Sequence, residues 1–552
     1  MYFAANIQSL NVLVHRIYSP LKILGSIALL IGVISCTNRN SEEQSHLVFR
    51  YNAHENITSL DPAFSMNLSN IWACTQLFNG LVQLDDSLAI VPDIASHWTQ
   101  SADGLKYDFF LKKGIYFHQH PAFGSEQTRE VVAADFVFSL NRLSDPQTAS
   151  PGGWVMQNVK NITAIDDHHL SFQLKKPFPA FLGLLSMRYC SVIPEEVIAE
   201  IGSDFRKKPI GTGPFKFKNW EEDVKLIFRK NQQYHEKDTL GNKLPYLEAV
   251  AITFVPDKQS EFILFLQKKI DFLNAIDNAY KDELLTNKGT LQEKYSQKIN
   301  LQKGPYLNTE YLGFYLDNPS PVIQSKSIRE AINIGFDRKK MMTYLRNNIG
   351  FIGEKGFIPR GLPGHPQKKR IQYQPQKALK LVEQFKKQTG LKPEINLATD
   401  ANYVDLCEYL QRELQKIGIF INIEVMPPAT LKQARSNGKL EMFRSSWIAD
   451  YPDAENYLSL FYSKNFSPSG PNYTHHNNPV YDLYFEKSYG LNAEEERYRR
   501  YQQMDSIAMS NHPLIPLYYD EVVRFTQKGI TGLSINPVND LKLKKVRKQK
   551  NR

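Results

Sequence analysis

The sequence predicts an α/β protein with more than one domain. Runs with the alternation of a β-strand and runs with the spacing of a helix follow one another along the whole chain, which is typical of mixed α/β folds. The 552 residues are too many for one ordinary hydrophobic core, so two or three domains are expected. Hydrophobic residues make up 42% and charged residues 22% of the chain, as in folded proteins.

The predicted elements lie between clear turn signals such as Gly80, Asp145-Pro146 and Gly418. In the first half, strands are expected at residues 47–52, 105–111 and 170–174, and helices at 72–79 and 133–141. In the second half, strands are expected at 311–316, 419–425 and 515–519, and helices at 327–336, 377–388, 405–417 and 497–510.

The net charge of +10 comes mostly from one end of the chain. Residues 542–552 (KLKKVRKQKNR) carry seven Lys or Arg and no acid, and the rest of the chain is close to balanced. The charge therefore gives no reason to expect a nucleic-acid partner. The basic tail is expected to be a solvated end, with contact to anionic lipid head groups as the alternative.

The four cysteines do not have the spacing of a metal site. Cys74 and Cys190 either form a disulfide in an oxidising compartment or are buried free thiols, as Cys407 can be. The nearest metal-like clusters, His118 with His120 and His475-His476, lack an acidic third ligand. The sequence predicts no metal and no cofactor.

The N-terminus has the features of a bacterial lipoprotein signal. Arg16 and Lys22 precede the apolar run 23–34, which is too short to span a bilayer. The following Ser35-Cys36 resembles the lipobox. Residues 1–35 are therefore a predicted signal peptide, Cys36 a predicted lipid acceptor, and the polar residues 36–45 a predicted tether. This implies anchoring on the periplasmic or outer side of a bacterial membrane.

Four segments, in the same order along the chain, resemble one protein family. They are residues 79–98, 209–220 (PIGTGPFKFKNW), 327–341 (SIREAINIGFDRKKM) and 447–458 (WIADYPDAENYL). They are similar to signature segments of the peptide/nickel-type extracellular solute-binding proteins of ABC transporters, and the resemblance runs from about residue 47 to 535. Gly211 and Gly213 in the second segment are read as part of a supporting turn rather than as ligand contacts.

The resemblance implies the two-lobed periplasmic-binding-protein (Venus-flytrap) fold. Lobe one would comprise 46–305, with an extra subdomain at 81–205, and would be completed by 516–541. Lobe two would comprise 306–515, leaving 542–552 as the tail. The extended runs near 306–316 and 514–519 would connect the lobes.

The resemblance also implies a function. The chain would act as a monomer that captures peptides between its lobes and delivers them to the permease subunits of an ABC importer. Peptide sensing and the binding of a nickel chelate, haem or glycan are alternatives. GxSxG and HExxH motifs are absent, so no enzyme is predicted.

The resemblance places the ligand site around Trp447-Ile448-Ala449-Asp450. Peptide-binding relatives hold the ligand amine with an Asp at the position of Asp450, and Tyr451 would complete that pair. The alternative is that Asp450 caps a turn with Pro452. Trp447 would stack on the ligand, or belong to the core.

Further contacts are expected on both sides of this motif. Arg444 would bind the ligand carboxylate, or form a salt bridge within its lobe. Ser445, Ser446 and Trp447, and the segment 59–62 with Leu60, would supply strand edges for the peptide backbone. The loop 399–403 lacks the Arg or His that holds short peptides in relatives, which favours longer or blocked peptides or another solute.

Overall fold

The computed structural model describes residues 47–549, apart from residues 276, 278 and 492. One eleven-stranded mixed sheet runs through both halves of the molecule in the order β15-β14-β16-β12-β17-β11-β1-β10-β9-β8, and β13 pairs with β17. Its strands are β1 (Val48–Asn52), β8 (Phe215–Glu221), β9 (Lys225–Lys230), β10 (Ala249–Thr253), β11 (Phe272–Asn274), β12 (Ile299–Phe314), β13 (Phe351–Ile352), β14 (Glu394–Thr399), β15 (Phe420–Val425), β16 (Met442–Ile448) and β17 (Leu514–Gln527).

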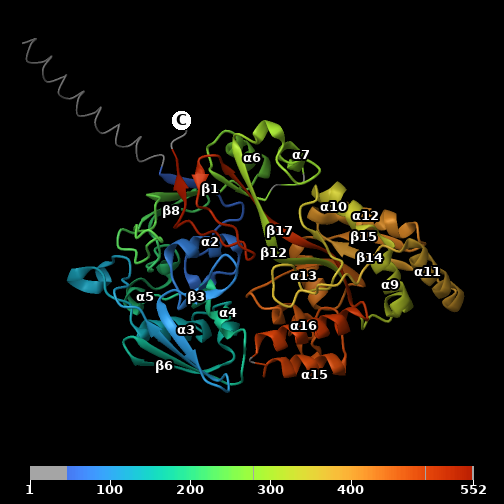
Figure 1. Ribbon diagram of the computed structural model, residues 1–552, viewed down its shortest axis with the longest axis horizontal. Helices are drawn as coiled ribbons and strands as arrows, with labels where there is room; N and C mark the ends of the chain where they lie inside the picture. Colours follow the sequence, from blue (N-terminus) through green and yellow to red (C-terminus); the bar gives the residue numbers. More distant parts are fainter. Residues whose placement is uncertain (1–46, 276, 278, 492, 550–552) are drawn as a thin grey trace, which may run out of the picture.

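Two long strands connect two lobes (Figure 1). The first half of β12 pairs with the second half of β17 beside the lobe-one strands, whereas residues Asn308–Phe314 of β12 pair with β16 of lobe two. The register between β12 and β17 shifts between Pro305 and Thr309, where the chain passes from one lobe to the other. The two-lobed α/β fold is thus confirmed, whereas the lobe boundaries at 46–305, 306–515 and 516–541 stay a prediction.

Lobe one carries a subdomain with a core of its own. A four-stranded antiparallel sheet, β4 (Ala95–Gln100), β5 (Lys106–Leu111), β7 (His169–Leu174) and β6 (Val159–Asp166), lies below a hairpin of β2 (Val82–Leu84) and β3 (Ile90–Pro92). The helices of lobe one are α2 (Leu68–Leu77), α3 (Ala133–Ser144), α4 (Phe181–Leu185), α5 (Glu195–Ile201), α6 (Lys258–Leu266) and α7 (Lys281–Leu284).

Lobe two is largely helical around β14, β15 and β16. Its helices are α8 (Pro321–Gln324), α9 (Lys326–Gly335), α10 (Arg338–Arg346), α11 (Pro375–Thr389), α12 (Val404–Gln415), α13 (Pro428–Ser436), α14 (Glu455–Leu458), α15 (Pro479–Ser488) and α16 (Glu494–Met509). Helix α9 shows why such segments fold as they do: Ser325 caps its start, and Ile328, Ala331 and Ile332 are fully buried on one face. None of the helices in the described part of the chain is long and apolar enough to span a membrane.

The turn at residues 210–214 supports the lobe, as expected. A side chain at Gly211 or Gly213 would place its Cβ 2.2 or 2.4 Å from main-chain atoms of Leu77, at the end of α2. Glycine is required here because two backbones approach closely. His118, one of the metal-like histidines, lies in the same place, with Nε2 3.0 Å from the Gly213 carbonyl oxygen.

The prediction of a solvated basic tail is wrong for the described residues 542–549. Leu543 and Val546 are fully buried in lobe one, and β19 (Arg547–Lys548) pairs with β18 (Ile530–Thr531). Lys544 lies 2.7 Å from Glu236 and Lys548 lies 2.7 Å from Asp271. The segment folds because two apolar side chains spaced three apart enter the core while the lysines find acidic partners.

Of the two alternatives for Cys74 and Cys190, a disulfide or buried free thiols, the second is confirmed. Cys74, Cys190 and Cys407 are free and buried. Burial raises the pKa of the first two thiols to about 12 and that of Cys407 to about 11. Cys36, the signal peptide 1–35 and the tether 36–45 lie outside the described residues.

Candidate functional site

Strand β16 has an open edge in lobe two. On one side it pairs with β12 from Met442 to Ile448. On the other side β14 reaches only Met442 and Phe443, because β14 ends at Thr399. Residues 444–448 therefore have no strand neighbour on this side within the described chain, and an extended ligand can pair there.

In an antiparallel strand, successive residues direct their main-chain N–H and C=O groups to alternate sides, which shows which groups of β16 face the open edge. The Ala449 N–H donates to the Leu307 carbonyl oxygen at 3.0 Å, so the odd-numbered residues before it direct their main-chain groups toward β12. Ser446 and Ile448 therefore direct their N–H and C=O groups outward. A weak contact lies there, with the Ser445 hydroxyl 3.4 Å from the Ser446 carbonyl oxygen.

Asp450 lies at the end of this edge, two residues after β16. Its side chain is exposed, yet desolvation by the surrounding protein raises the pKa of its carboxyl. Asn456 donates a long hydrogen bond of 3.4 Å to it. Among the described residues no cationic side chain forms an ion pair with Asp450. Burial and the negative charge of Asp450 together raise the pKa of Tyr189 to about 12. The Asp450 carboxylate therefore faces the lobe-one subdomain.

Asn456 is a site residue that the sequence analysis missed. Its amide oxygen accepts a hydrogen bond of 2.8 Å from the indole N–H of Trp447, and its amide nitrogen reaches Asp450. Trp447 is half-buried and packs against the lobe-two core, and its stacking on a ligand stays a prediction. Asn456 lies in the segment 447–458, three residues after Asp453. Its place within this motif was the signal in the sequence that could have identified it.

Tyr451 does not complete the pair with Asp450. Its hydroxyl donates to Glu455 instead, and its ring is buried against the subdomain of lobe one. Burial raises the pKa of Glu455 to about 7, although hydrogen bonds from Tyr451 and Tyr489 oppose this shift.

Arg444 forms a salt bridge within its lobe, which was the second of the two alternatives. It is buried and pairs with Glu310 on β12, while a second contact of 3.5 Å reaches Asp400 after β14. Burial raises the pKa of the Glu310 carboxyl, and the positive charge of Arg444 opposes that shift. This cluster underlies the end of the open edge that is remote from Asp450.

Replacing Arg444 with methionine is expected to lower the free energy of unfolding by about 3–5 kcal/mol, because Glu310 would remain buried and uncompensated. The double variant Arg444→Met with Glu310→Gln should recover most of this loss. Urea denaturation of the native, single and double variants measures both effects. Equal stability of the two variants would show that the ion pair is not the source of the loss.

A cation that the sequence analysis missed lies beside this cluster. Arg346, at the end of α10, pairs with Asp520 of β17 at 2.7 Å, and the two side chains are 24% and 18% exposed. The negative charge of Glu310, the partner of Arg444, also acts on Arg346, which places Arg346 near Arg444. Arg346 thus provides a cation at this end of the edge, which the loop 399–403 does not.

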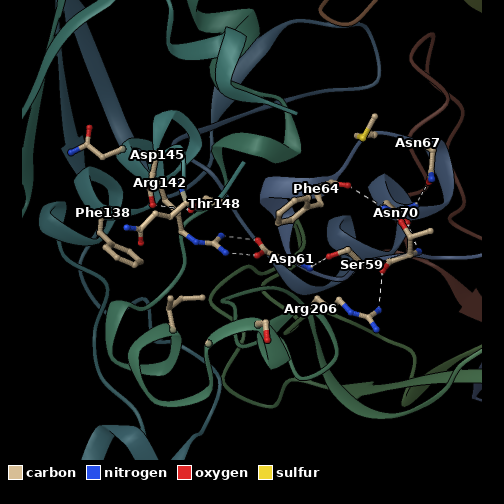
Figure 2. Close-up of a pocket in the computed structure, with 17 residues that line it drawn as sticks. Ser59, Asp61, Phe64, Asn67, Asn70, Phe138, Arg142, Asp145, Thr148 and Arg206 are labelled. Atoms are coloured by element: carbon tan, nitrogen blue, oxygen red, sulfur yellow. Dashed lines mark hydrogen bonds and ion pairs between the residues drawn. The ribbon is translucent and has the colours of Figure 1, made fainter. Parts of the chain in front are cut away.

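The segment 59–62 does not reach β16. Leu60 is fully buried, its N–H donates to the Arg206 carbonyl oxygen at 2.9 Å, and its carbonyl accepts from the Cys74 thiol at 3.6 Å. Ser59 and Asp61 line a cavity of about 1120 Å³ whose lining residues all belong to lobe one, and Asp61 forms a two-pronged ion pair with Arg142 there (Figure 2). Both main-chain groups of Leu60 thus have partners within lobe one, and its assignment as a strand edge for the ligand stays a prediction.

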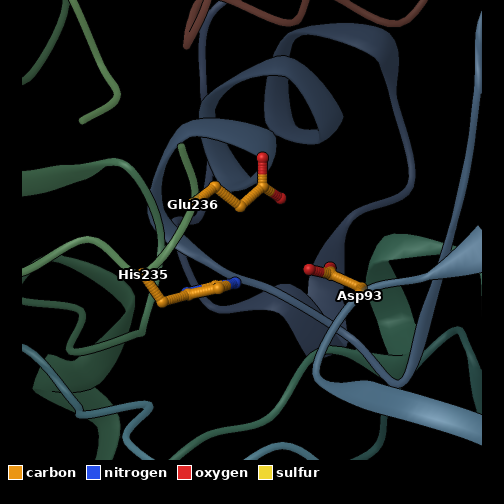
Figure 3. A group of neighbouring side chains, drawn as sticks. All are labelled: Asp93, His235 and Glu236. Atoms are coloured by element: carbon orange, nitrogen blue, oxygen red, sulfur yellow. The ribbon is translucent and has the colours of Figure 1, made fainter. Parts of the chain in front are cut away.

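Asp93, His235 and Glu236 form a compact group in lobe one, with candidate ligand atoms within 4.8 Å of one another (Figure 3). The group was missed because Asp93 is more than 140 residues away from the adjacent pair His235 and Glu236 in the sequence. Both carboxylates already have partners: Lys544 pairs with Glu236, and the Asp93 carboxylate accepts hydrogen bonds from the Asn79 amide and the Gly80 N–H. A metal ion would have to displace Lys544.

The comparisons with known proteins point in one direction. Residues 89–469 match the model of the bacterial extracellular solute-binding proteins, family 5. The chain is 25% identical over 502 residues to a protein named probable di/tripeptide-binding protein 5 of Pseudomonas aeruginosa, covering 84% of this chain and 88% of that one. It is 26% identical over 467 residues to heme-binding protein A of Haemophilus influenzae, covering 80% and 81%.

A solved structure agrees with this. The periplasmic binding protein DppA of Helicobacter pylori, in complex with the peptide STSA, superposes with a TM-score of 0.74 at 25% identity, covering 91% of this chain and 98% of that one. The likeness thus extends over both lobes and the connecting strands.

Proposed function

The chain belongs to family 5 of the bacterial extracellular solute-binding proteins, and from that premise we propose that it captures peptides between its lobes. The open edge of β16 carries this proposal, because it ends at a carboxylate that forms no ion pair within the described part of the chain. Outward main-chain groups of Ser446 and Ile448 would pair with a peptide backbone of any sequence, and Asp450 would bind its amine. Relatives named for peptide binding support this choice of ligand.

The peptide is proposed to be longer than a dipeptide. Asp450 follows Arg444 by six positions in the sequence, which corresponds to about 20 Å of extended chain. A ligand carboxylate at the far end of the edge would meet Arg346 and compete with Asp520 for it, since Arg444 is held by Glu310 and Asp400. A peptide of about four to six residues spans this length.

Delivery to a transporter completes the proposal. Cys36 would carry the lipid that anchors the chain to the membrane, and a monomer whose lobes have closed on a peptide would be recognised by the permease subunits of an ABC importer. Closure follows from contacts that the ligand makes with both lobes, so it reports occupancy.

Isothermal titration with peptides of two to six residues tests this function. We expect tetra- to hexapeptides of unrelated sequence to bind with similar affinity, and dipeptides to bind more weakly. Mass spectrometry of material that co-purifies with the chain should detect peptides. The proposal fails if no peptide binds and the co-purified ligand is haem, a nickel chelate or a glycan.

A further inference from the structure

Asp93, His235 and Glu236 bring three metal-ligating side chains together in lobe one. Asp93 lies between β3 and β4, whereas His235 and Glu236 lie in the loop between β9 and β10. One donor atom of each lies within 4.8 Å of the others, and Figure 3 shows the imidazole of His235 pointing toward the Asp93 carboxylate. Donors that bind one ion at about 2.0–2.2 Å are at most about 4.4 Å apart, so small side-chain rotations would bring all three to a metal.

His235 contributes a ring nitrogen that is available to a ligand. Its Nε2 atom is buried and has no hydrogen-bond partner among the described residues. A buried polar atom without a partner is costly, and a metal ion would satisfy it. Burial lowers the pKa of His235, so the imidazole is neutral near pH 7 and keeps a lone pair for a metal.

Hydrogen bonds from neutral groups hold Asp93, which is 2% exposed, in a fixed orientation. The amide nitrogen of Asn79 donates to both Asp93 carboxylate oxygens, at 2.9 and 3.1 Å, and the Gly80 N–H donates at 3.1 Å. The Thr212 hydroxyl donates to the amide oxygen of Asn79 at 3.1 Å, which fixes that amide in turn. Such donors orient a metal-ligating carboxylate and leave its negative charge for the ion.

Lys544 is the side chain that a metal ion would replace. Its ammonium group lies 2.7 Å from the Glu236 carboxylate and 3.2 Å from the amide oxygen of Gln83. Gln83 can therefore keep Lys544 when an ion takes its place at Glu236. The tail itself need not move, because Leu543 and Val546 hold it in the core.

We propose that Asp93, His235 and Glu236 bind one divalent transition-metal ion, such as Zn²⁺, which replaces the ammonium group of Lys544 at Glu236. One nitrogen and two carboxylate oxygens form a ligand set that Zn²⁺ accepts, whereas Ca²⁺ and Mg²⁺ use oxygen ligands. The ion joins the turn between β3 and β4 to the loop between β9 and β10, and so strengthens lobe one. The site is separate from the open edge of β16, so this proposal does not depend on peptide binding.

Variants of the ligands and of the competing lysine should change the zinc affinity in opposite directions. Titration of the chain with ZnCl₂ against a chromophoric chelator measures the affinity. His235→Ala and Asp93→Asn each remove a ligand and should weaken Zn²⁺ binding at least about tenfold. Lys544→Met removes the competing cation and should strengthen it about tenfold. His97→Ala removes an exposed histidine on β4 and is the matched control, whose affinity should equal that of the native chain.

Thermal unfolding gives an independent measure. An ion that binds only the folded chain raises its Tm, so Zn²⁺ should raise the Tm of the native chain and of Lys544→Met but not that of His235→Ala. The unfolding curves without zinc show whether each variant folds. His235→Ala removes a half-buried side chain and tests the site even if Asp93→Asn does not fold.

The proposal is overturned if the native chain binds no Zn²⁺. It is also overturned if His235→Ala folds and binds Zn²⁺ as tightly as the native chain does. An unchanged zinc affinity in Lys544→Met would overturn the exchange of the lysine for the ion at Glu236.

Discussion

Exchange of Asp450 for asparagine should weaken the binding of a free-amine peptide by about a hundredfold, because a charge-assisted bond is lost and the amine is left without its counter-charge. Asparagine keeps the size of the side chain, and its amide oxygen can still accept the hydrogen bond from Asn456. Isothermal titration of the native and variant chains with one pentapeptide measures the effect.

A matched acid and a matched ligand make this experiment specific. Glu424→Gln removes one negative charge from an exposed position on β15 and should leave the affinity unchanged. The N-acetylated peptide should bind the native chain and the Asp450→Asn variant equally, since it has no charge for Asp450 to recognise. An Asp450→Asn variant that keeps its affinity for the free-amine peptide would remove Asp450 from the site.

Local pattern was sufficient to predict most of the regular elements. The helices expected at 327–336, 377–388 and 405–417 appear as α9, α11 and α12, because their apolar spacing agrees with burial in lobe two. The two connecting strands were predicted too short. Gly304-Pro305 in β12 and Pro516 in β17 resemble strand ends, and only the pairing of these strands with each other keeps the backbone extended through them.

The site was predictable where it depends on one continuous segment. Ser446, Trp447 and Asp450 lie along one edge in the structure, and their assignment as ligand contacts stays a proposal. Arg346 and Asn456 were missed because their roles depend on neighbours from other elements, Asp520 for the first and Trp447 for the second. Leu60 lies in the core of lobe one with both main-chain groups already paired, which no local pattern reveals.

The C-terminal tail is another segment whose structure depends on partners that are distant in the sequence. A run of seven cations in eleven residues is typical of a solvated end. The acids that bind it, Glu236 and Asp271, are separated from the tail by more than 270 residues, so the sequence alone gives no sign that the lysines are paired.

Truncation after Leu541 is expected to lower the free energy of unfolding by about 5 kcal/mol or more. Leu543 and Val546 are fully buried, and burial of such side chains contributes about 1.5–3 kcal/mol each. Loss of Lys548 also leaves Asp271, which is 3% exposed, without its cation. Urea denaturation followed by circular dichroism measures the change.

Truncation after Gln549 is the matched control, because it removes three terminal residues and retains every contact named above; its stability should equal that of the full chain. The double variant Lys544→Met with Lys548→Met separates charge from packing, since it keeps Leu543 and Val546 in the core while Glu236 and Asp271 lose their partners. If the tail serves mainly to bind anionic lipid, truncation after Leu541 would instead leave the unfolding curve unchanged and abolish binding to vesicles that contain anionic phospholipid.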